Sequence, residues 1–163
     1  MSGPRSSGTV LILGRGKVGR GLTGALMAAG VDSLLRSARR PRRADISRAR
    51  LVVLAVPDHA IVDTTLRVAP QLPKRSPLLH CAGAQPADLA KAAAGGRPVG
   101  AMHPLVSFAD PRRPPTLTDT TFVIAGDAAA VRAARELALA LGARPLTRPV
   151  HGPAYHAAAA LVA

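Results

Sequence analysis

Residues 9–19 read TVLILGRGKVG, and this stretch decides the fold that we expect for the chain. Its first five residues form an apolar run with the length of a buried strand, and three glycines follow in the spacing G-x-G-x-x-G. The next residues, up to position 29, repeat apolar side chains at helical spacing and stop at a glycine. A glycine triplet alone is weak evidence, because it also arises by chance. A strand, a glycine turn and a helix in immediate succession are the arrangement that gives it meaning.

Each glycine of this turn has its own expected role. Gly14 allows the tight turn, Gly16 lets the backbone approach a pyrophosphate, and Gly19 lets the helix pack closely on the strand. The helix N-terminus also presents N–H groups and the positive end of its dipole to phosphates. We therefore expect the turn to bind a dinucleotide through Gly14, Arg15, Gly16, Lys17, Val18 and Gly19. The alternative is an ordinary glycine-rich turn between a strand and a helix.

The rest of the chain alternates short aliphatic runs with alanine- and leucine-rich stretches. We expect further strands at residues 31–35, 51–56, 77–81, 98–102, 121–125 and 144–147, and further helices at 58–68, 86–94, 128–141 and 155–163. Residues 36–50 leave little room for a full helix and strand. This alternation predicts an α/β fold of the Rossmann type, a doubly wound and mostly parallel sheet with helices on both faces.

Composition narrows the class of protein further. The chain has 163 residues, 48% of them hydrophobic, which is enough for one domain with a real core and argues against general disorder. No apolar run approaches the ~20 residues that cross a bilayer, so we expect no membrane partner. The single Cys81 fits a reducing compartment, and we expect a cytoplasmic protein. We expect a loose tail at residues 1–8, a dinucleotide-binding domain at 9–152 and the start of an inter-domain helix at 153–163.

A net charge of +13 indicates an anionic partner without identifying it. Of the 22 basic residues only three are lysines, and such an arginine bias also arises from GC-rich coding sequences. Nucleic acid is the partner that high basicity first suggests. We do not expect it here, because aromatic residues for stacking make up only 2% of the chain.

Residues at the end of the second strand contact the 2′ group on the adenosine ribose of the cofactor, which distinguishes NADP from NAD. An NAD site usually has an acidic residue there, but Asp32 lies at the start of that strand. The strand instead ends at Arg36 and Ser37, with Arg39 close behind. A guanidinium and a hydroxyl suit a 2′-phosphate, so we expect Arg36 and Ser37 to bind NADP in preference to NAD. The alternatives are a solvated basic loop and an RNA-contacting patch.

Other candidates follow the expected strands. Ala55, Val56 and Pro57 should line the nicotinamide side, because ligands of such sheets lie beyond the carboxyl ends of the strands. Asp58 follows them, and we favour a helix-cap role for it over catalysis. His80 and His103 also end strands, where an imidazole can bind or protonate a substrate atom, although a structural role is slightly favoured for each alone. We see no activated thiol at Cys81 and no spacing typical of a metal site.

Five segments together resemble the Rossmann-like DUF2520-domain proteins, relatives of pyrroline-5-carboxylate reductase, ketopantoate reductase and 3-hydroxyisobutyrate dehydrogenase. They are GRGKVG at 14–19, LAVPDHAI at 54–61, HCAG at 80–83, MHPLVSF at 102–108 and YHAAA at 155–159. The resemblance implies an NAD(P)-binding domain followed by an all-helical domain that closes the active site and often forms the dimer. We expect this chain to lack that second half, which a second copy or a partner chain would then supply.

The function expected from these features is that of an NADP-dependent oxidoreductase. It would move hydride between nicotinamide and a small C=O or C=N metabolite, with His103 and His156 as polar partners of the substrate. The alternative is a non-catalytic NADP-binding module, truncated or completed by a partner chain. A single open domain excludes water poorly, which is the physical reason for keeping this alternative.

Overall fold

A seven-stranded sheet forms the centre of the computed structural model, which describes residues 8–110 and 112–147. The strands are β1 Thr9–Leu13, β2 Ser33–Arg36, β3 Ala49–Leu54, β4 Leu78–His80, β5 Val99–Pro104, β6 Thr121–Gly126 and β7 Arg144–Thr147. Their order is β2-β1-β3-β4-β5-β6-β7, and every neighbouring pair is parallel except β5 and β6. The expected α/β fold with a mostly parallel sheet is confirmed. The strand order reverses between β1 and β3, and such a switch point is where sheets of this kind bind ligands.

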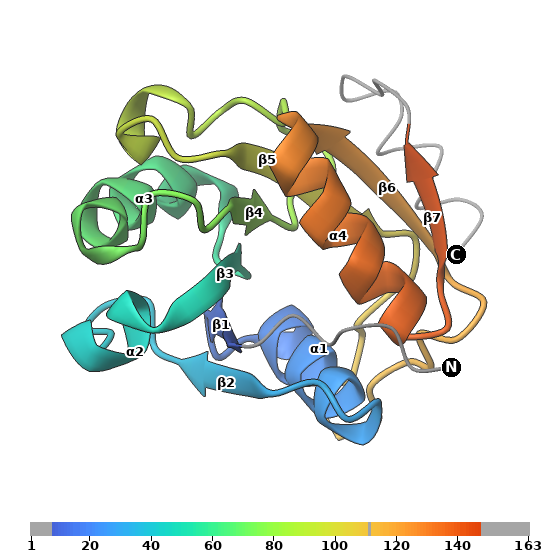
Figure 1. Cartoon of the computed structure of the whole chain (residues 1–163). Helices are drawn as coiled ribbons and strands as arrows, with labels where there is room; N and C mark the ends of the chain where they lie inside the picture. Colours follow the sequence, from blue (N-terminus) through green and yellow to red (C-terminus); the bar gives the residue numbers. More distant parts are fainter. Residues whose placement is uncertain (1–7, 111, 148–163) are drawn as a thin grey trace.

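Helices cover both faces of this sheet. They are α1 Lys17–Ala28, α2 Arg43–Ser47, α3 Ile61–Val68 and α4 Ala128–Ala140, with short 3-10 turns at Asp58–Ala60, Ala69–Gln71 and Ala92–Ala94. One apolar core joins the sheet to α1 and α4, and a second joins it to α2 and α3 (Figure 1).

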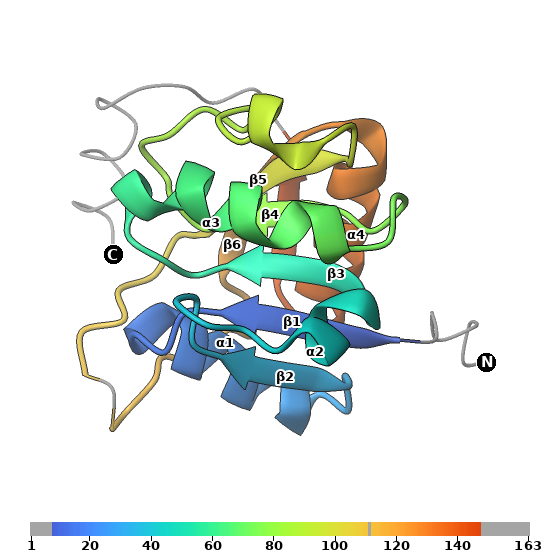
Figure 2. The same cartoon turned by 90° about the vertical axis from the view of Figure 1, so that its left-hand side faces the viewer.

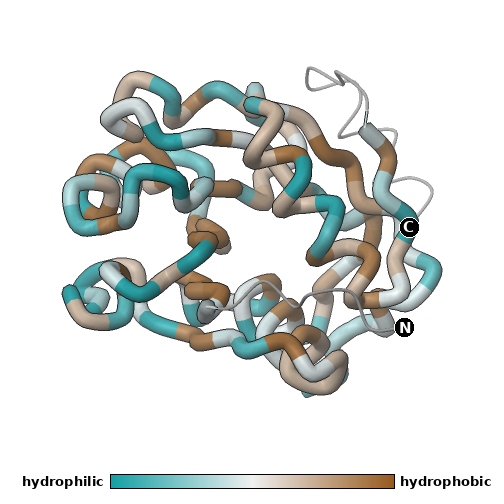
Figure 3. Tube along the Cα trace, in the orientation of Figure 1, coloured by the Kyte–Doolittle hydropathy of each residue, from teal (hydrophilic) through white to brown (hydrophobic). Residues whose placement is uncertain are grey.

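The central strands explain why these two cores form. In β1, Val10 and Ile12 belong to the core under α1 and α4, whereas Leu11 and Leu13 belong to the core on the other face. Successive side chains of a strand point to opposite faces, so a strand buried on both sides must be apolar throughout. Brown, hydrophobic segments accordingly lie along strands such as β6 (Figure 3).

Residues 36–50 contain only the five-residue helix α2, of which Ile46 alone is buried, in keeping with the little room expected there for a full helix. Two other local expectations are wrong. The helix expected at 86–94 is a series of turns that ends in the 3-10 turn Ala92–Ala94, with Gly95 left-handed after it. Asp58 caps no helix through its side chain, because α3 begins three residues later, after a 3-10 turn. The helix expected at 155–163 lies outside the described residues.

The carboxyl ends of the parallel strands share one edge. In Figure 2 the arrows of β1, β2 and β3 point the same way, and the gold segment after β5 passes along the edge that they reach. Within residues 8–110 and 112–147, no helix is long and apolar enough to cross a membrane.

Candidate functional site

The glycine turn between β1 and α1 is held between the ends of two other strands. The Gly14 N–H donates to the Arg36 carbonyl (2.9 Å), and the Ala55 N–H donates to the Leu13 carbonyl (2.8 Å). Gly14 has φ +126°, and a Cβ there would lie 2.1 Å from the Ala55 carbonyl oxygen. Both the backbone conformation and the lack of room therefore require glycine at this position.

Gly19 and Gly16 differ in what surrounds them. A Cβ at Gly19 would lie 1.9 Å from the Gly14 carbonyl oxygen, because α1 packs directly on the turn that precedes it. At Gly16, φ is −72°, and among the described residues no atom beyond its two chain neighbours lies within 4 Å of the Cβ position. Neither the backbone nor the packing of the described residues requires glycine there. The empty space above Gly16 fits a group that approaches the backbone closely, as a pyrophosphate does.

Two cavities meet at this turn, and both are lined by Gly16, Ala55, Val56 and Pro57. The first has a volume of about 650 Å³ and extends over the ends of β4 and β5. The second, about 420 Å³, extends over the end of β2 and onto α3. The two cavities thus adjoin one another and share residues of the glycine turn and of the end of β3 in their walls.

The turn favours an anion electrostatically. The first turn of α1 has no acidic residue, and no side chain caps it, so the positive end of the helix dipole is not neutralised there. Exposed Lys17 lines the first cavity, and exposed Arg15 and Arg39 line the second. The second cavity also has Asp63, so its lining is mixed in charge with an excess of cations.

The end of β2 arranges its arginines differently from our expectation. Arg36 is absent from the lining of the second cavity, and its Nε donates to Asp45 Oδ2 of α2 at 2.7 Å. Ser37 and Arg39 do line that cavity, and the Arg39 N–H donates to Ser37 Oγ. Arg67 of α3 donates to the carbonyl oxygen of Ala38 (2.7 Å) and so ties the turn to the helix.

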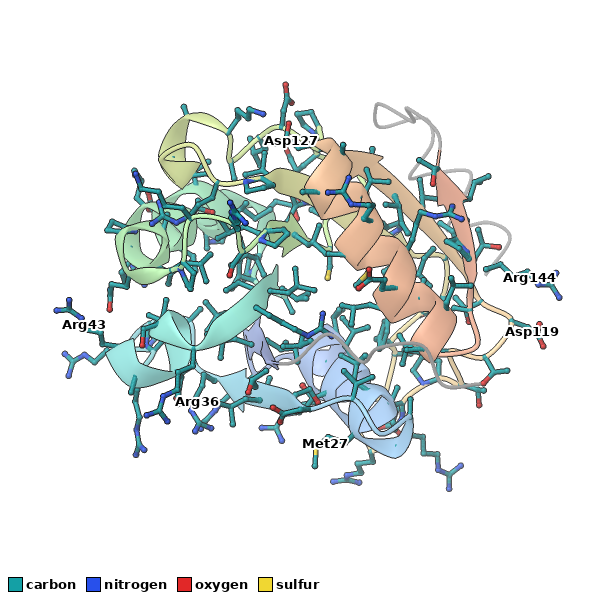
Figure 4. All side chains as sticks on the ribbon, in the orientation of Figure 1. Met27, Arg36, Arg43, Asp119, Asp127 and Arg144 are labelled. Carbon is teal, nitrogen blue, oxygen red and sulfur yellow. The ribbon has the colours of Figure 1, made fainter. Side chains whose placement is uncertain are left out.

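Arg43 of this segment lines neither cavity. In Figure 4 the labelled Arg43 extends outward from α2. Asp32 lies before β2, at the opposite end of the sheet, where its carboxylate accepts a hydrogen bond from Thr9 Oγ1 (2.6 Å). Asp32 therefore does not take the usual NAD position at the end of β2.

His103, at the end of β5, lines the first cavity and is half-buried. Its Nδ1 lies 2.9 Å from the Cys81 carbonyl oxygen. Because a carbonyl oxygen only accepts, Nδ1 carries the proton, and in the neutral ring Nε2 carries the lone pair. The chain thus selects one tautomer of this imidazole.

His80 and Cys81 follow each other at the end of β4. His80 is 1% exposed, and its Nε2 donates to the Pro86 carbonyl at 3.0 Å. Burial lowers the pKa of His80, so its ring is neutral at pH 7. Burial raises the pKa of the Cys81 thiol to about 12, so the expectation of a thiol without nucleophilic activation is confirmed.

No protein-family model and no curated protein matches the chain, but many solved structures share its fold. A provisionally assigned NADP oxidoreductase from Bacteroides fragilis is 15% identical over 96% of this chain and 66% of its own, with a TM-score of 0.78. The prephenate dehydrogenase from A. aeolicus, in complex with hydroxyphenyl propionate and NAD+, is 12% identical over 94% and 63% (TM-score 0.74). The pyrroline carboxylate reductase from Plasmodium falciparum, with NADP bound, is 9% identical over 87% and 58% (TM-score 0.68).

The chain has a Rossmann-like fold. At these identities the likeness shows the fold alone. The chain spans 58–66% of the length of the three structures.

The Rossmann-like fold brings most of the predicted site residues together. Gly14, Arg15, Gly16, Lys17, Val18, Ser37, Ala55, Val56, Pro57 and His103 line one or both cavities. Gly19 serves the packing of α1, and Arg36 is paired with Asp45. His156 lies outside the described residues. Within the described residues no group of three metal-ligating side chains gathers.

Sequence reasoning missed other lining residues of this Rossmann-like fold. Ser107 and Phe108 end the MHPLVSF segment at 102–108, and the sequence analysis gave neither of them a site role, yet they line the first cavity. Phe108 packs on Gly21 of α1, where a Cβ would lie 2.6 Å from its ring. A glycine inside the helix was the available signal for this contact. Nothing in the sequence pointed to Arg67.

Proposed function

We propose that the chain binds NADP(H) across its two cavities and forms the nucleotide-binding part of an oxidoreductase. The reaction is hydride transfer between the nicotinamide and a small C=O or C=N metabolite. The observation that carries the proposal is the empty space above Gly16, at the point where the two cavities meet. A dinucleotide has this shape, with two nucleosides joined by a pyrophosphate, and the helix N-terminus favours the anion.

The second cavity takes the adenosine half in this proposal. Ser37 and Arg39 line it at the end of β2, where a hydroxyl and a guanidinium can bond a 2′-phosphate. This supports NADP over NAD. The contact predicted for Arg36 stays a prediction, since its Nε is paired with Asp45 and it lies outside the cavity lining.

The first cavity takes the nicotinamide and the substrate. The cofactor supplies the hydride, and the chain supplies position and a proton relay. In this tautomer, Nε2 of His103 is an acceptor when the ring is neutral and a donor when the ring is protonated. His103 would thus hold the substrate oxygen or nitrogen and give it a proton as carbon receives the hydride. The role predicted for His156 remains part of the proposal.

The likeness to DUF2520-domain proteins also belongs to this proposal, together with a second copy or a partner chain over the first cavity. The fold shared with a pyrroline carboxylate reductase supports it.

Amide NMR of the ¹⁵N-labelled chain titrated with NADP+ tests the binding site. We expect the largest shifts at Gly14–Val18, Ser37, Arg39, Ala55 and Val56. Gly24, on α1 but away from the turn and lining neither of the two cavities, is the internal control. Shifts scattered over the basic surface, or none at saturating nucleotide, would contradict the proposal.

Turnover is tested by mixing NADPH with a panel of small aldehydes, ketones and imines. The proposal predicts NADPH consumption with at least one of them and its loss in His103→Gln. Tight NADPH binding without consumption across the panel would favour the non-catalytic NADP-binding module.

A further inference from the structure

Residues 81–86 connect β4 to the turns that follow, and they lie directly against His103. We call them the 81–86 segment. It has no regular secondary structure, so its conformation depends on the contacts that hold it in place. At its start, the Cys81 carbonyl accepts the hydrogen bond from His103 Nδ1 (2.9 Å). At its end, the Pro86 carbonyl accepts the hydrogen bond from His80 Nε2 (3.0 Å).

Three hydrogen bonds hold the far end of the segment. His80 is 1% exposed, so its Nε2–H finds no water to replace the Pro86 carbonyl when this bond breaks, and the loss is costly. The exposed Pro86 also accepts a backbone hydrogen bond from the Leu89 N–H (3.1 Å). Gln85 Nε2 donates to Asp58 Oδ2 at 3.2 Å, but this pair is exposed to solvent and contributes little. Of the two side chains that hold the Pro86 end, the buried imidazole of His80 is therefore the stronger.

The middle of the segment touches the His103 ring itself. A Cβ at Gly83 would lie 2.6 Å from Nε2 and 2.8 Å from both Cδ2 and Cε1 of His103. The ring thus rests against the bare Cα of Gly83 while its Nδ1 is bonded to the Cys81 carbonyl. Its orientation and its tautomer both depend on where the 81–86 segment lies.

We propose that His80 is a positioning residue for His103. By fastening the Pro86 end, it holds the Cys81 carbonyl and the Gly83 surface where they keep the His103 ring Nδ1-protonated at the first cavity. The proposal rests on the proposed function in giving His103 a substrate-facing role. Without the anchor, the 81–86 segment moves, the Nδ1 bond weakens and the ring samples its other tautomer, in which Nε2 carries the proton.

Three variants separate this role from general structural damage. His80→Gln keeps an N–H donor at the position of Nε2, whereas His80→Leu removes the donor and keeps an apolar side chain of moderate size. Gly83→Ala leaves His80 intact and places a methyl group against the His103 ring. Imidazole ¹⁵N NMR reports the tautomer of His103, assigned by comparison with His103→Gln. NADPH affinity and the thermal midpoint are measured on every variant.

We expect a single Nδ1-protonated form of His103 in the parent chain and in His80→Gln. In His80→Leu and Gly83→Ala the ratio of the two tautomers should fall about five- to tenfold, as expected for loss of one hydrogen bond. In His80→Leu the NADPH affinity should stay within twofold, because His80 lines neither cavity.

The proposal is overturned if His103 keeps its Nδ1-protonated form in folded His80→Leu. If that variant does not fold, an unchanged His103 in Gly83→Ala, or a changed one in His80→Gln, overturns it instead. A parent chain that fails to bind NADPH refutes the proposed function, while the tautomer of His103 still decides the role of His80. Failure of the proposed function is therefore seen in NADPH binding, and failure of the role of His80 is seen in the tautomer of His103.

Discussion

Gly16→Ala separates the binding of a nucleotide from the stability of the fold. Apart from its two chain neighbours, no atom of the described residues lies within 4 Å of the Cβ position, and φ is −72°, so the described part of the fold accepts a methyl group without strain. Alanine is a poorer N-cap than glycine by up to about 1 kcal/mol, while its smaller unfolded-state entropy returns about 0.4–1 kcal/mol. The free energy of unfolding should therefore stay within about 1 kcal/mol of the parent value.

A bound pyrophosphate changes this result, because it occupies the space that the methyl group takes. Overpacking of a well-fitted contact costs about 1–3 kcal/mol, which corresponds to a roughly 5- to 150-fold weaker NADPH complex. Calorimetric titration with NADPH and urea denaturation, run in parallel, measure the two effects separately.

Gly24→Ala is the matched control for Gly16→Ala. Gly24 is a second glycine of α1 with nothing within 4 Å of its Cβ position, and it lines neither cavity of the site. Alanine in a helix interior should stabilise the fold by about 0.5–1 kcal/mol and leave NADPH affinity unchanged. Equal NADPH affinities for Gly16→Ala and the parent chain would refute the placement of the pyrophosphate.

Three further predictions follow from the same geometry. Gly19→Ala should lower the free energy of unfolding by about 1–3 kcal/mol in urea denaturation, because its Cβ would meet the backbone oxygen of Gly14 at 1.9 Å; a parent-like value would contradict the close packing of α1. Arg39→Ala should weaken NADPH binding about five- to tenfold and leave NADH binding unchanged in calorimetric titrations, and Arg36→Ala tests the sequence-based prediction in the same way. Burial raises the pKa of Cys81 to about 12 from its usual 9.0. The contribution of the protonated thiol to the free energy of unfolding is therefore fully present below pH 9.0 and is lost as the pH rises above 9.0. Denaturation curves on both sides of pH 9.0 should show this fall in the parent chain and not in Cys81→Ala.

Features encoded in local sequence were predictable. The glycine turn combines an apolar strand, fixed glycine spacing and a helix start, all within residues 9–29. The strand β3 is buried on both faces and therefore reads as a continuous aliphatic run. Because the carboxyl ends of parallel strands share one edge, the positions of Ala55 and His103 at strand ends were enough to place both at one site.

Features that depend on distant partners were not predictable. The helix α2 has five residues and only Ile46 buried, so it carries no periodic signal. The pairing of Arg36 with Asp45 joins residues nine positions apart on different elements, and the turn at Ser37 is tied to α3 through Arg67. The tautomer of His103 depends on a carbonyl from another strand end. Such contacts follow from packing, and no local pattern encodes them.

Parallel equilibrium titrations of the chain with NADPH and NADH, followed by the fluorescence of the reduced nicotinamide, test the central claim most directly. The account predicts saturable binding of both nucleotides, with NADPH bound about tenfold or more tightly, because the 2′-phosphate gains charge-assisted hydrogen bonds at the end of β2. Binding of neither nucleotide, or tighter binding of NADH, would contradict it.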